Sequence, residues 1–291
     1  MRRVTLPACA LLLAISGTAG AASTTWTVCA SAATGCQFEG MDGLQQAVDR
    51  AADGDTIRLR AGRYVPQGTR DVPYDKLTIR GAVLLDGRDL KLLGEEGVVF
   101  DGSAGTPSSA IVVRGGRVSL QRLRLEGYRA ENSEDDTYDG HGLFFIDADA
   151  DVDDVTIRGV AKMALTARGA SHVRARRLQI LDGHVGIWLE ETARLELDEA
   201  TVRNNDSAGI CAYGRSTARI RRSTFEANRD DGVYTEGDAT IAVEQSEVAR
   251  NAPYGLRATG QSRITSTRNR LLANATAPTA TEGEGQVVVV E

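Results

Sequence analysis

A short pattern of hydrophobic positions recurs along the second half of the chain at a nearly constant interval, roughly 23 residues, which lies in the range of structural repeats. Each repeat opens with a small residue and an aliphatic one, at Gly142-Leu143, Ala164-Leu165, Gly186-Ile187, Gly209-Ile210, Gly232-Val233 and Gly255-Leu256. Two further hydrophobic pairs follow in each repeat, as in Leu195/Leu197 and Ala200/Val202. Residues two apart share one side of a strand, so the pattern predicts three short strands per repeat. No room is left for a helix between them, which predicts a β-solenoid.

A column of amide side chains marks one bend of each predicted coil. Asn205, Asn228, Asn251 and Asn274 follow one another at an identical spacing of one coil, and Asp182 precedes Asn205 by the same interval. Asn and Asp tolerate left-handed backbone and hydrogen-bond to nearby backbone, so both suit a tight bend. Stacked in successive coils, the asparagine amides can also bond to one another along the axis.

One amphipathic helix is predicted ahead of the strands, over residues 41–54. Leu44, Ala47, Val48 and Ala51 form one apolar helical face. Asp42 is the expected N-cap and Gly54 the residue that stops the helix. Repeat proteins need caps at their ends, and this helix is expected to cover one end of the core.

These features together resemble a known superfamily. The Asn-x-x-x-Gly-[Ile/Val/Leu] repeat, the N-terminal helix and the run Ala-Asp-Gly-Asp-Thr-Ile-Arg-Leu at residues 52–59 are similar to the pectate lyase-like superfamily, from about Met41 to the end. The resemblance implies an all-β, right-handed parallel β-helix in a single domain over residues 23–291, most regular over 142–275. That superfamily includes lyases, hydrolases, epimerases, esterases, phage tailspikes and adhesins, so the resemblance indicates the fold and leaves the activity open.

The N-terminus predicts export. Arg2 and Arg3 precede a short apolar segment, Ala8 to Ile15, and small residues follow, which is typical of a signal peptide over residues 1–22. We therefore expect a secreted or periplasmic protein without a membrane span. In an oxidising compartment Cys29 and Cys36 are expected to form a disulfide, which leaves Cys211 as an unpaired thiol.

Charge narrows the choice of partner. The net charge of −6 becomes about −8 once the two arginines of the signal segment are removed, because that segment carries no acid. An acidic protein is a poor partner for nucleic acid. The sequence does not indicate an oligomeric state.

The outward positions of the second strand carry alternating charges. One row reads Asp153, Arg174, Glu196 and Arg219, and the row two residues later reads Arg176, Asp198, Arg221 and Glu244. Neighbouring coils lie about 4.8 Å apart, so these rows predict ion pairs between coils on a solvated face.

The outward positions of the first strand are different. One column contains Phe144, Thr166, Trp188, Cys211, Tyr234 and Arg257, and the next contains Arg168, Glu190, Tyr213 and Glu236. Lys162 and His184 precede the strand at equivalent positions, and His141 lies one residue off their column. Aromatic rings beside carboxylates and bases suit sugar rings, which predicts a polysaccharide or glycan site that uses Trp188, Tyr213, Tyr234, Glu190 and Glu236. The alternative is that the rings only stabilise the sheet.

Three functions fit this face, and the first is a lyase or epimerase acting on uronate polysaccharide. Such an enzyme needs a base to take the proton beside a carboxyl group and a cation to hold that carboxylate. Lys162 or His184 is the candidate base, Arg168 is the candidate clamp, and His141 is a further candidate catalytic residue. An acidic loop could bind Ca²⁺, whose ligands are oxygens, through Asp135, Asp136 and Asp139, with Glu131 and Glu134 nearby. The simpler interpretation of that loop is a solvated run of charges.

The second function is a glycoside hydrolase and the third is a glycan-binding or adhesin-type solenoid without catalysis. Gly140-His141-Gly142 resembles an element of polygalacturonases, but the other elements of that family have no match here. Glu190 and Glu236 lie two coils apart, roughly 9.6 Å by strand spacing, a marginal separation for an inverting pair. Compact coils with short turns favour binding without catalysis.

Overall fold

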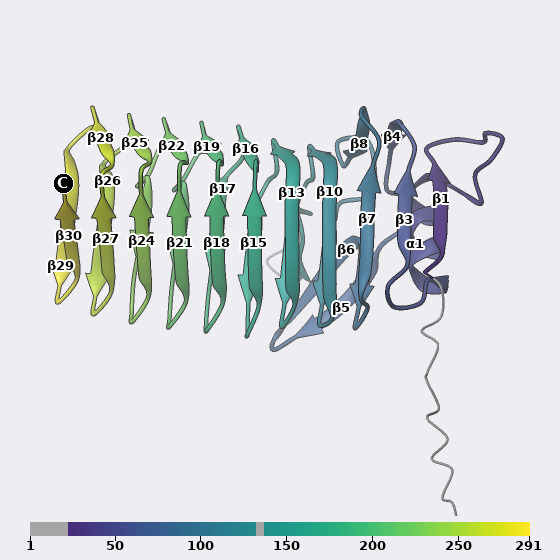
Figure 1. Ribbon diagram of the computed structural model, residues 1–291, viewed down its shortest axis with the longest axis horizontal. Helices are drawn as coiled ribbons and strands as arrows, with labels where there is room; N and C mark the ends of the chain where they lie inside the picture. The colour runs from purple at the N-terminus through teal and green to yellow at the C-terminus, as the bar shows by residue number, and fades with distance from the viewer. Residues whose placement is uncertain (1–22, 132–136) are drawn as a thin grey trace, which may run out of the picture.

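The computed structural model of the chain describes residues 23–131 and 137–291, which form two long sheets around a shared hydrophobic core (Figure 1). Sheet A has 19 strands and sheet B has 11. Within the described residues, every paired strand is parallel to its partner except β5 with β6, and α1 is the one helix. The prediction of a right-handed parallel β-helix behind an N-terminal helix is confirmed.

The strands of sheet A are β1 (Thr25–Cys29), β2 (Phe38–Glu39), β3 (Thr56–Leu59), β4 (Gly62–Tyr64), β7 (Leu90–Gly94), β8 (Val98–Asp101), β10 (Arg117–Glu126), β13 (Asp149–Arg158), β15 (His172–Arg176), β16 (Gln179–Leu181), β18 (Arg194–Asp198), β19 (Thr201–Arg203), β21 (Thr217–Arg221), β22 (Thr224–Glu226), β24 (Thr240–Glu244), β25 (Glu247–Ala249), β27 (Arg263–Thr267), β28 (Arg270–Leu272) and β30 (Gln286–Val290). Those of sheet B are β5 (Arg70–Tyr74), β6 (Leu77–Asp86), β9 (Ser109–Arg114), β11 (Thr137–Tyr138), β12 (Leu143–Ile146), β14 (Met163–Arg168), β17 (Val185–Leu189), β20 (Ile210–Ala212), β23 (Val233–Thr235), β26 (Tyr254–Gly260) and β29 (Ala277–Gly283).

The first strand of each coil belongs to sheet B, and the second and third strands belong to sheet A. Ile187 is paired with Ile210, and Ile210 with Val233, so each hydrophobic position stacks on its equivalent in the next coil. These three side chains are fully buried. Burial of each such side chain contributes about 1.5–3 kcal/mol, so the repeat stabilises the molecule along its whole length.

The helix α1 (Gly40–Arg50) covers the N-terminal end of the core, at the purple end of Figure 1. Leu44, Ala47 and Val48 are buried as predicted. The expected boundaries were wrong. The N-cap is Glu39, which makes no side-chain capping bond, and Asp42 already lies in the first turn. The helix ends before Ala51, whose backbone is extended, so Gly54 lies in the following turn.

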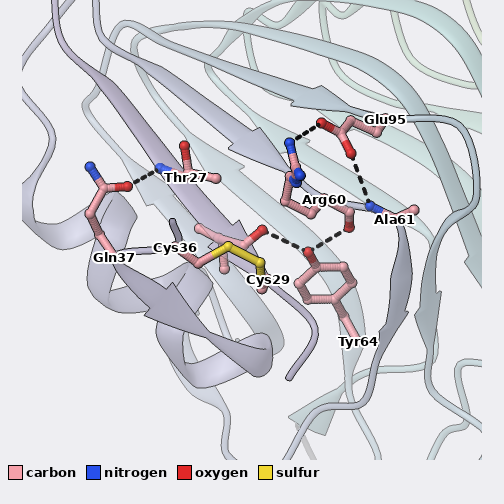
Figure 2. Close-up of a disulfide and its surroundings, with 9 residues drawn as sticks. Thr27, Cys29, Cys36, Gln37, Arg60, Ala61, Tyr64 and Glu95 are labelled. Carbon is pink, nitrogen blue, oxygen red and sulfur yellow. Dashed lines mark hydrogen bonds and ion pairs between the residues drawn. A yellow bond between two sulfur atoms is a disulfide. The ribbon is translucent and has the colours of Figure 1, made fainter. Parts of the chain in front are cut away.

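A disulfide joins Cys29 and Cys36 beside this cap, as predicted (Figure 2). The two Cα atoms are 5.9 Å apart, an ordinary separation for a disulfide. Nearby, the Tyr64 hydroxyl lies 2.9 Å from the carbonyl oxygen of Val28 and 2.8 Å from that of Arg60. Cys211 is free and buried, and burial raises the pKa of its thiol to about 12.

The asparagine column is hydrogen-bonded along the axis, and all of its members except the last, Asn274, are buried. The Oδ1 of Asn228 accepts from the backbone N–H (3.2 Å) and the Nδ2 (2.9 Å) of Asn205. Asn228 makes the same two bonds to Asn251, at 3.1 and 2.9 Å. Asn251 makes them to Asn274, at 3.0 and 3.2 Å.

Two details of the predicted bend were wrong. Leu181 is paired with Arg203, so the position equivalent to Asn205 is Gly183 and not Asp182. This coil is one residue shorter at the bend, and Gly183 donates its N–H to the Oδ1 of Asn205 at 3.1 Å. The left-handed residue is the one before each buried asparagine, for example Asn204, with φ of 57°.

The outer face of sheet A carries ion pairs between coils, as expected, but the partners differ from the predicted rows: Arg176 pairs with Glu199 at 3.2 Å and not with Asp198. Arg174 pairs with Asp151 at 2.6 Å, and Asp153 belongs instead to the row of Arg176. Farther along, Arg219 and Glu244 are 3.2 Å apart. The predicted rows fail because Asp151, not Asp153, is the strand partner of Arg174, and because Arg219 reaches diagonally to Glu244, whose strand partner is Arg221.

Two departures from the regular coil lie on sheet B. Leu125 is paired with Ile157, so the extra residues between them form an insertion within one coil, as predicted. The other was not foreseen: β5 folds back antiparallel on β6 and crosses the outer face of sheet B (Figure 1).

The predicted signal peptide, residues 1–22, lies outside the described residues. No helix within residues 23–131 and 137–291 is long and apolar enough to span a membrane.

We expect Asn228→Ala to destabilise the protein by about 3 kcal/mol, because it leaves the buried backbone N–H and the Nδ2 of Asn205 without an acceptor. Urea-induced unfolding measures this. Asp206→Ala removes an exposed side chain at the same bend and should cost less than about 0.5 kcal/mol. Equal losses in the two variants would contradict the role of the column.

The hydrogen bonds of Asp55 at the N-terminal cap predict that the stability of the protein depends on pH. Its buried carboxylate accepts bonds from the Thr24 N–H (2.7 Å), the Trp26 Nε1 (2.9 Å) and the Ala52 N–H (3.0 Å). These bonds, led by that of Thr24, hold the pKa of Asp55 below its usual 3.8. The stabilisation is therefore complete above about pH 4 and is lost as the pH falls through the lowered pKa. Asp55→Asn should cost about 1.5–3 kcal/mol near neutral pH, and its deficit should shrink in acid. A deficit that stays constant down to acid pH would contradict this assignment.

Candidate functional site

The outer face of sheet B carries the candidate residues, because each coil adds one equivalent position to every column. The first predicted column is confirmed by the strand register, which pairs Phe144 with Thr166, Thr166 with Trp188, Trp188 with Cys211, Cys211 with Tyr234 and Tyr234 with Arg257. The backbone hydrogen bonding of the sheet thus aligns residues far apart in sequence on one surface.

Three aromatic rings on this face form a continuous strip over three coils. The ring centroids of Trp188 and Tyr213 are 4.5 Å apart, and those of Tyr213 and Tyr234 are 5.8 Å apart. All three side chains are half-buried and pack against an apolar group that includes Met163 and Cys211. The strip therefore has a fixed position and keeps part of its surface in solvent.

Arg168 is the most enclosed cation at the N-terminal end of the strip. Its guanidinium lies 2.6 Å from a carboxylate oxygen of Glu190, and the two side chains are 13% and 23% exposed. Its Cζ is 5.9 Å from the ring centroid of Tyr74, 5.7 Å from that of Tyr138 and 6.0 Å from that of Phe144. The Nε is buried without a hydrogen-bond partner. Arg168 thus holds one carboxylate of the protein and retains one unused donor.

Lys162 and His184 lie side by side in neighbouring coils, ahead of β14 and β17. The backbone N–H of Val185 donates to the carbonyl oxygen of Lys162 at 3.2 Å, which fixes this register. His184 is exposed, and Lys162 is half-buried with its Nζ 5.1 Å from the ring centroid of Tyr138. Both nitrogen groups are positioned to meet a ligand that approaches this edge.

His141 lies below the surface and not beside Lys162. Its side chain is fully buried, with the ring centroid 4.6 Å from that of Tyr138 and 5.0 Å from that of Phe144. Its Nδ1 lies 2.9 Å from the hydroxyl of Ser109. Burial, reinforced by the charges of Lys162 and Arg168, lowers the pKa of His141 to about 3. The imidazole is therefore neutral, and in this conformation it is closed to a ligand.

The two glutamates of the hydrolase hypothesis occupy equivalent positions two coils apart, but both have protein partners. Glu190 pairs with Arg168. Exposed Glu236 accepts a hydrogen bond from the Tyr234 hydroxyl at 2.7 Å. Neither carboxylate stands free toward a sugar.

The metal prediction receives no support from the described residues. Asp135 and Asp136 lie outside them. Asp139 is buried, accepts from the backbone N–H of Glu131 at 3.2 Å and lies 3.7 Å from Arg80. Burial raises the pKa of Asp139, which disfavours an exposed ionic site. Within residues 23–131 and 137–291, no group of three or more His, Cys, Asp and Glu side chains is arranged to hold a metal ion.

Two residues on this face, Tyr74 and Asp231, were missed. Tyr74 reaches it on the unforeseen β5, and no periodic signal points to it. Asp231 is buried beside Arg257, with its carboxylate 3.7 Å from the guanidinium. Burial and the neighbouring Asp230 raise the pKa of Asp231 to about 6. The sequence repeat does contain a signal for Asp231, because the residue just before each Gly-aliphatic pair also faces outward.

Solved structures with a similar fold include two lyases. A rhamnogalacturonan lyase superposes with a TM-score of 0.66 at 11% identity, over 84% of this chain and 74% of that one. The pectate lyase Pel9A superposes with a TM-score of 0.60 at 11% identity, over 85% and 70%. The product of ORF18 of Geobacillus virus E2 gives 0.52 at 10% identity, over 83% and 56%. At these identities the likeness shows the fold alone.

No curated protein matches the sequence. Residues 125–291, more than half of the chain, match the model of the family described as the right handed beta helix region, and the chain belongs to that family.

Proposed function

We propose that this is an exported protein that acts on polysaccharide, and that it binds uronate chains on the outer face of sheet B as a lyase or epimerase. One observation carries the proposal: the aromatic strip of Trp188, Tyr213 and Tyr234 continues into the edge where Lys162 and His184 lie side by side. The apolar faces of sugar rings pack against aromatic side chains, and a nitrogen base beside them is suited to proton abstraction. The disulfide at the cap supports an oxidising compartment and hence export.

In the proposed reaction, Lys162 or His184 in its uncharged form takes the proton from the carbon beside the uronate carboxyl group. The electron pair of that C–H bond passes into the carboxyl group, whose developing charge needs a cation. In a lyase the pair then forms a carbon–carbon double bond as the glycosidic oxygen leaves and takes up a proton. In an epimerase the proton returns to the opposite face of the same carbon. The unused Nε donor of Arg168 supports its place as the carboxylate clamp.

The second candidate is a glycan-binding protein without catalysis, and the Arg168–Glu190 pair favours it. A guanidinium already neutralised at 2.6 Å has less to offer a substrate carboxylate. The same pair weakens the hydrolase hypothesis, because it occupies Glu190.

The lysines and histidines of this chain allow a matched test of the reaction. We expect Lys162→Met or His184→Ala to lower the release of unsaturated ends from polygalacturonate or alginate by about 10²-fold or more. Lys91→Met and His172→Ala remove the same residue types from sheet A and should leave the rate unchanged. Product should be followed with and without added Ca²⁺. Equal losses in all four variants would contradict the assignment, and binding without product in the wild type would favour the non-catalytic candidate.

The aromatic strip makes a separate prediction about affinity. Trp188→Ala should weaken glycan binding about tenfold, since it removes the half-buried ring at one end of the strip. Isothermal titration measures this. The chain has two tryptophans, so any fluorescence response to glycan should vanish when only Trp26 remains. Unchanged affinity in a variant that unfolds at the wild-type temperature would place the binding site elsewhere.

A further inference from the structure

The segment of residues 70–80, here called the arm, consists of β5 and the part of β6 before Gly81. Gly81 is the first residue of β6 that pairs with β9, so the arm extends beyond the coil to which it belongs. Its apolar side chains, Val72 and Ile79, are buried against Val112, Phe144 and Ile146 on the outer face of sheet B. In Figure 1 the arm slants behind β10 toward β13. It therefore lies on the same face as the candidate site.

The tip of the arm reaches the middle of that face. The Tyr74 hydroxyl donates to a carboxylate oxygen of Glu191 at 2.7 Å, across 117 residues of sequence. Glu191 follows β17, and four steps between neighbouring strands separate β6 from β17, roughly 19 Å at parallel-strand spacing. From Gly81 to Leu77, the residue opposite Tyr74 in the hairpin, β6 spans about 13 Å, and the Tyr74 and Glu191 side chains bridge the rest of the distance.

The tip lies over Arg168, one of two residues of β14 with a buried polar group that the protein does not satisfy. The ring of Tyr74 lies over the guanidinium of Arg168, whose Nε has no partner. The hydroxyl of Thr166, on the same strand as Arg168, is also buried without a partner. Unpaired buried donors cost free energy when water is excluded. With the tip closed, these buried donors have no acceptor in the protein, and a bound ligand would supply one.

The two ends of the arm are held unequally. At its base, Arg80 lies 2.6 Å from Glu131 and 3.7 Å from both Asp71 and Asp139. At the tip, Asp75 and Lys76 are exposed, and Tyr74 and Leu77 are only partly buried against the apolar cluster. The tip can therefore lift while the base stays packed.

We propose that the arm is a strap whose tip, latched by the Tyr74–Glu191 hydrogen bond, opens to uncover Arg168 for an acidic sugar of the polysaccharide. In the free protein the arm then covers part of the site. The free energy needed to open the arm weakens the apparent affinity for the ligand. The acidic-sugar part rests on the proposed function, whereas the opening itself does not.

The latch is tested without any glycan. Tyr74→Phe removes only the donor, and Glu191→Gln replaces the charged acceptor by a neutral amide. Each should raise hydrogen exchange of the backbone amides of residues 70–79 roughly threefold to tenfold. Each should also speed modification of Arg168 by phenylglyoxal, followed by peptide mass spectrometry. Tyr234→Phe is the matched control for exchange and Arg168 modification alone, because it deletes hydroxyl hydrogen bonds to Glu236 at 2.7 Å and Thr259 at 3.1 Å elsewhere on the face. Unchanged exchange and Arg168 modification in both latch variants would overturn the strap.

Binding of a galacturonate or mannuronate oligomer then separates the two proposals. If both latch variants bind the oligomer more tightly, by a factor similar to the increase in their hydrogen-exchange rates, the strap opens for this ligand as proposed. If hydrogen exchange is faster but the affinity is unchanged, the strap does not control ligand binding, and the proposed function is left intact. Failure of wild type and variants alike to bind either oligomer, with Arg168 exposed faster in both latch variants, overturns the acidic-sugar ligand and leaves the opening established.

Discussion

Parallel pairing of equivalent residues, one coil above the next, is the constraint on which the rest of this structure depends. Each coil supplies the hydrogen-bond partners of its neighbour, and a one-residue slip on a strand would turn every side chain to the other face. The buried asparagine column fixes the register at one bend, because each amide bonds to the backbone and the side chain of the next coil. A shift between coils would leave several buried polar groups unpaired at once.

The same stacking creates the candidate site. Side chains one coil apart in the sequence become neighbours, so a few aromatic residues in an aromatic-poor chain form a strip and two bases become adjacent. The outer face of sheet A shows what stacking gives when charges alternate: pairs that satisfy one another and leave little for a ligand. On sheet B the charges are fewer and aromatic rings surround them.

Enclosure distinguishes the members of the site. Arg168 and His141 share one aromatic environment, which Tyr138 and Phe144 form. Within it the imidazole of His141 is neutral. Lys162 and His184, at the edge, keep contact with solvent. The arm extends the aromatic enclosure by adding Tyr74, and it connects the early, irregular coils to the regular ones where the candidate chemistry lies.

The sequence by itself determined the features that repeat. Periodicity gives the coil length, the inward and outward positions of each strand and the column from Phe144 to Arg257, because in a solenoid contacts occur between equivalent positions. The cysteine pair follows separately, from the short spacing between Cys29 and Cys36. Tertiary structure alone decided the features that do not repeat. The burial of His141 depends on Tyr138, and the partner of Arg168 depends on which carboxylate stacking brings within reach. The antiparallel arm and its Tyr74–Glu191 bond join segments 117 residues apart, a contact that no local pattern encodes.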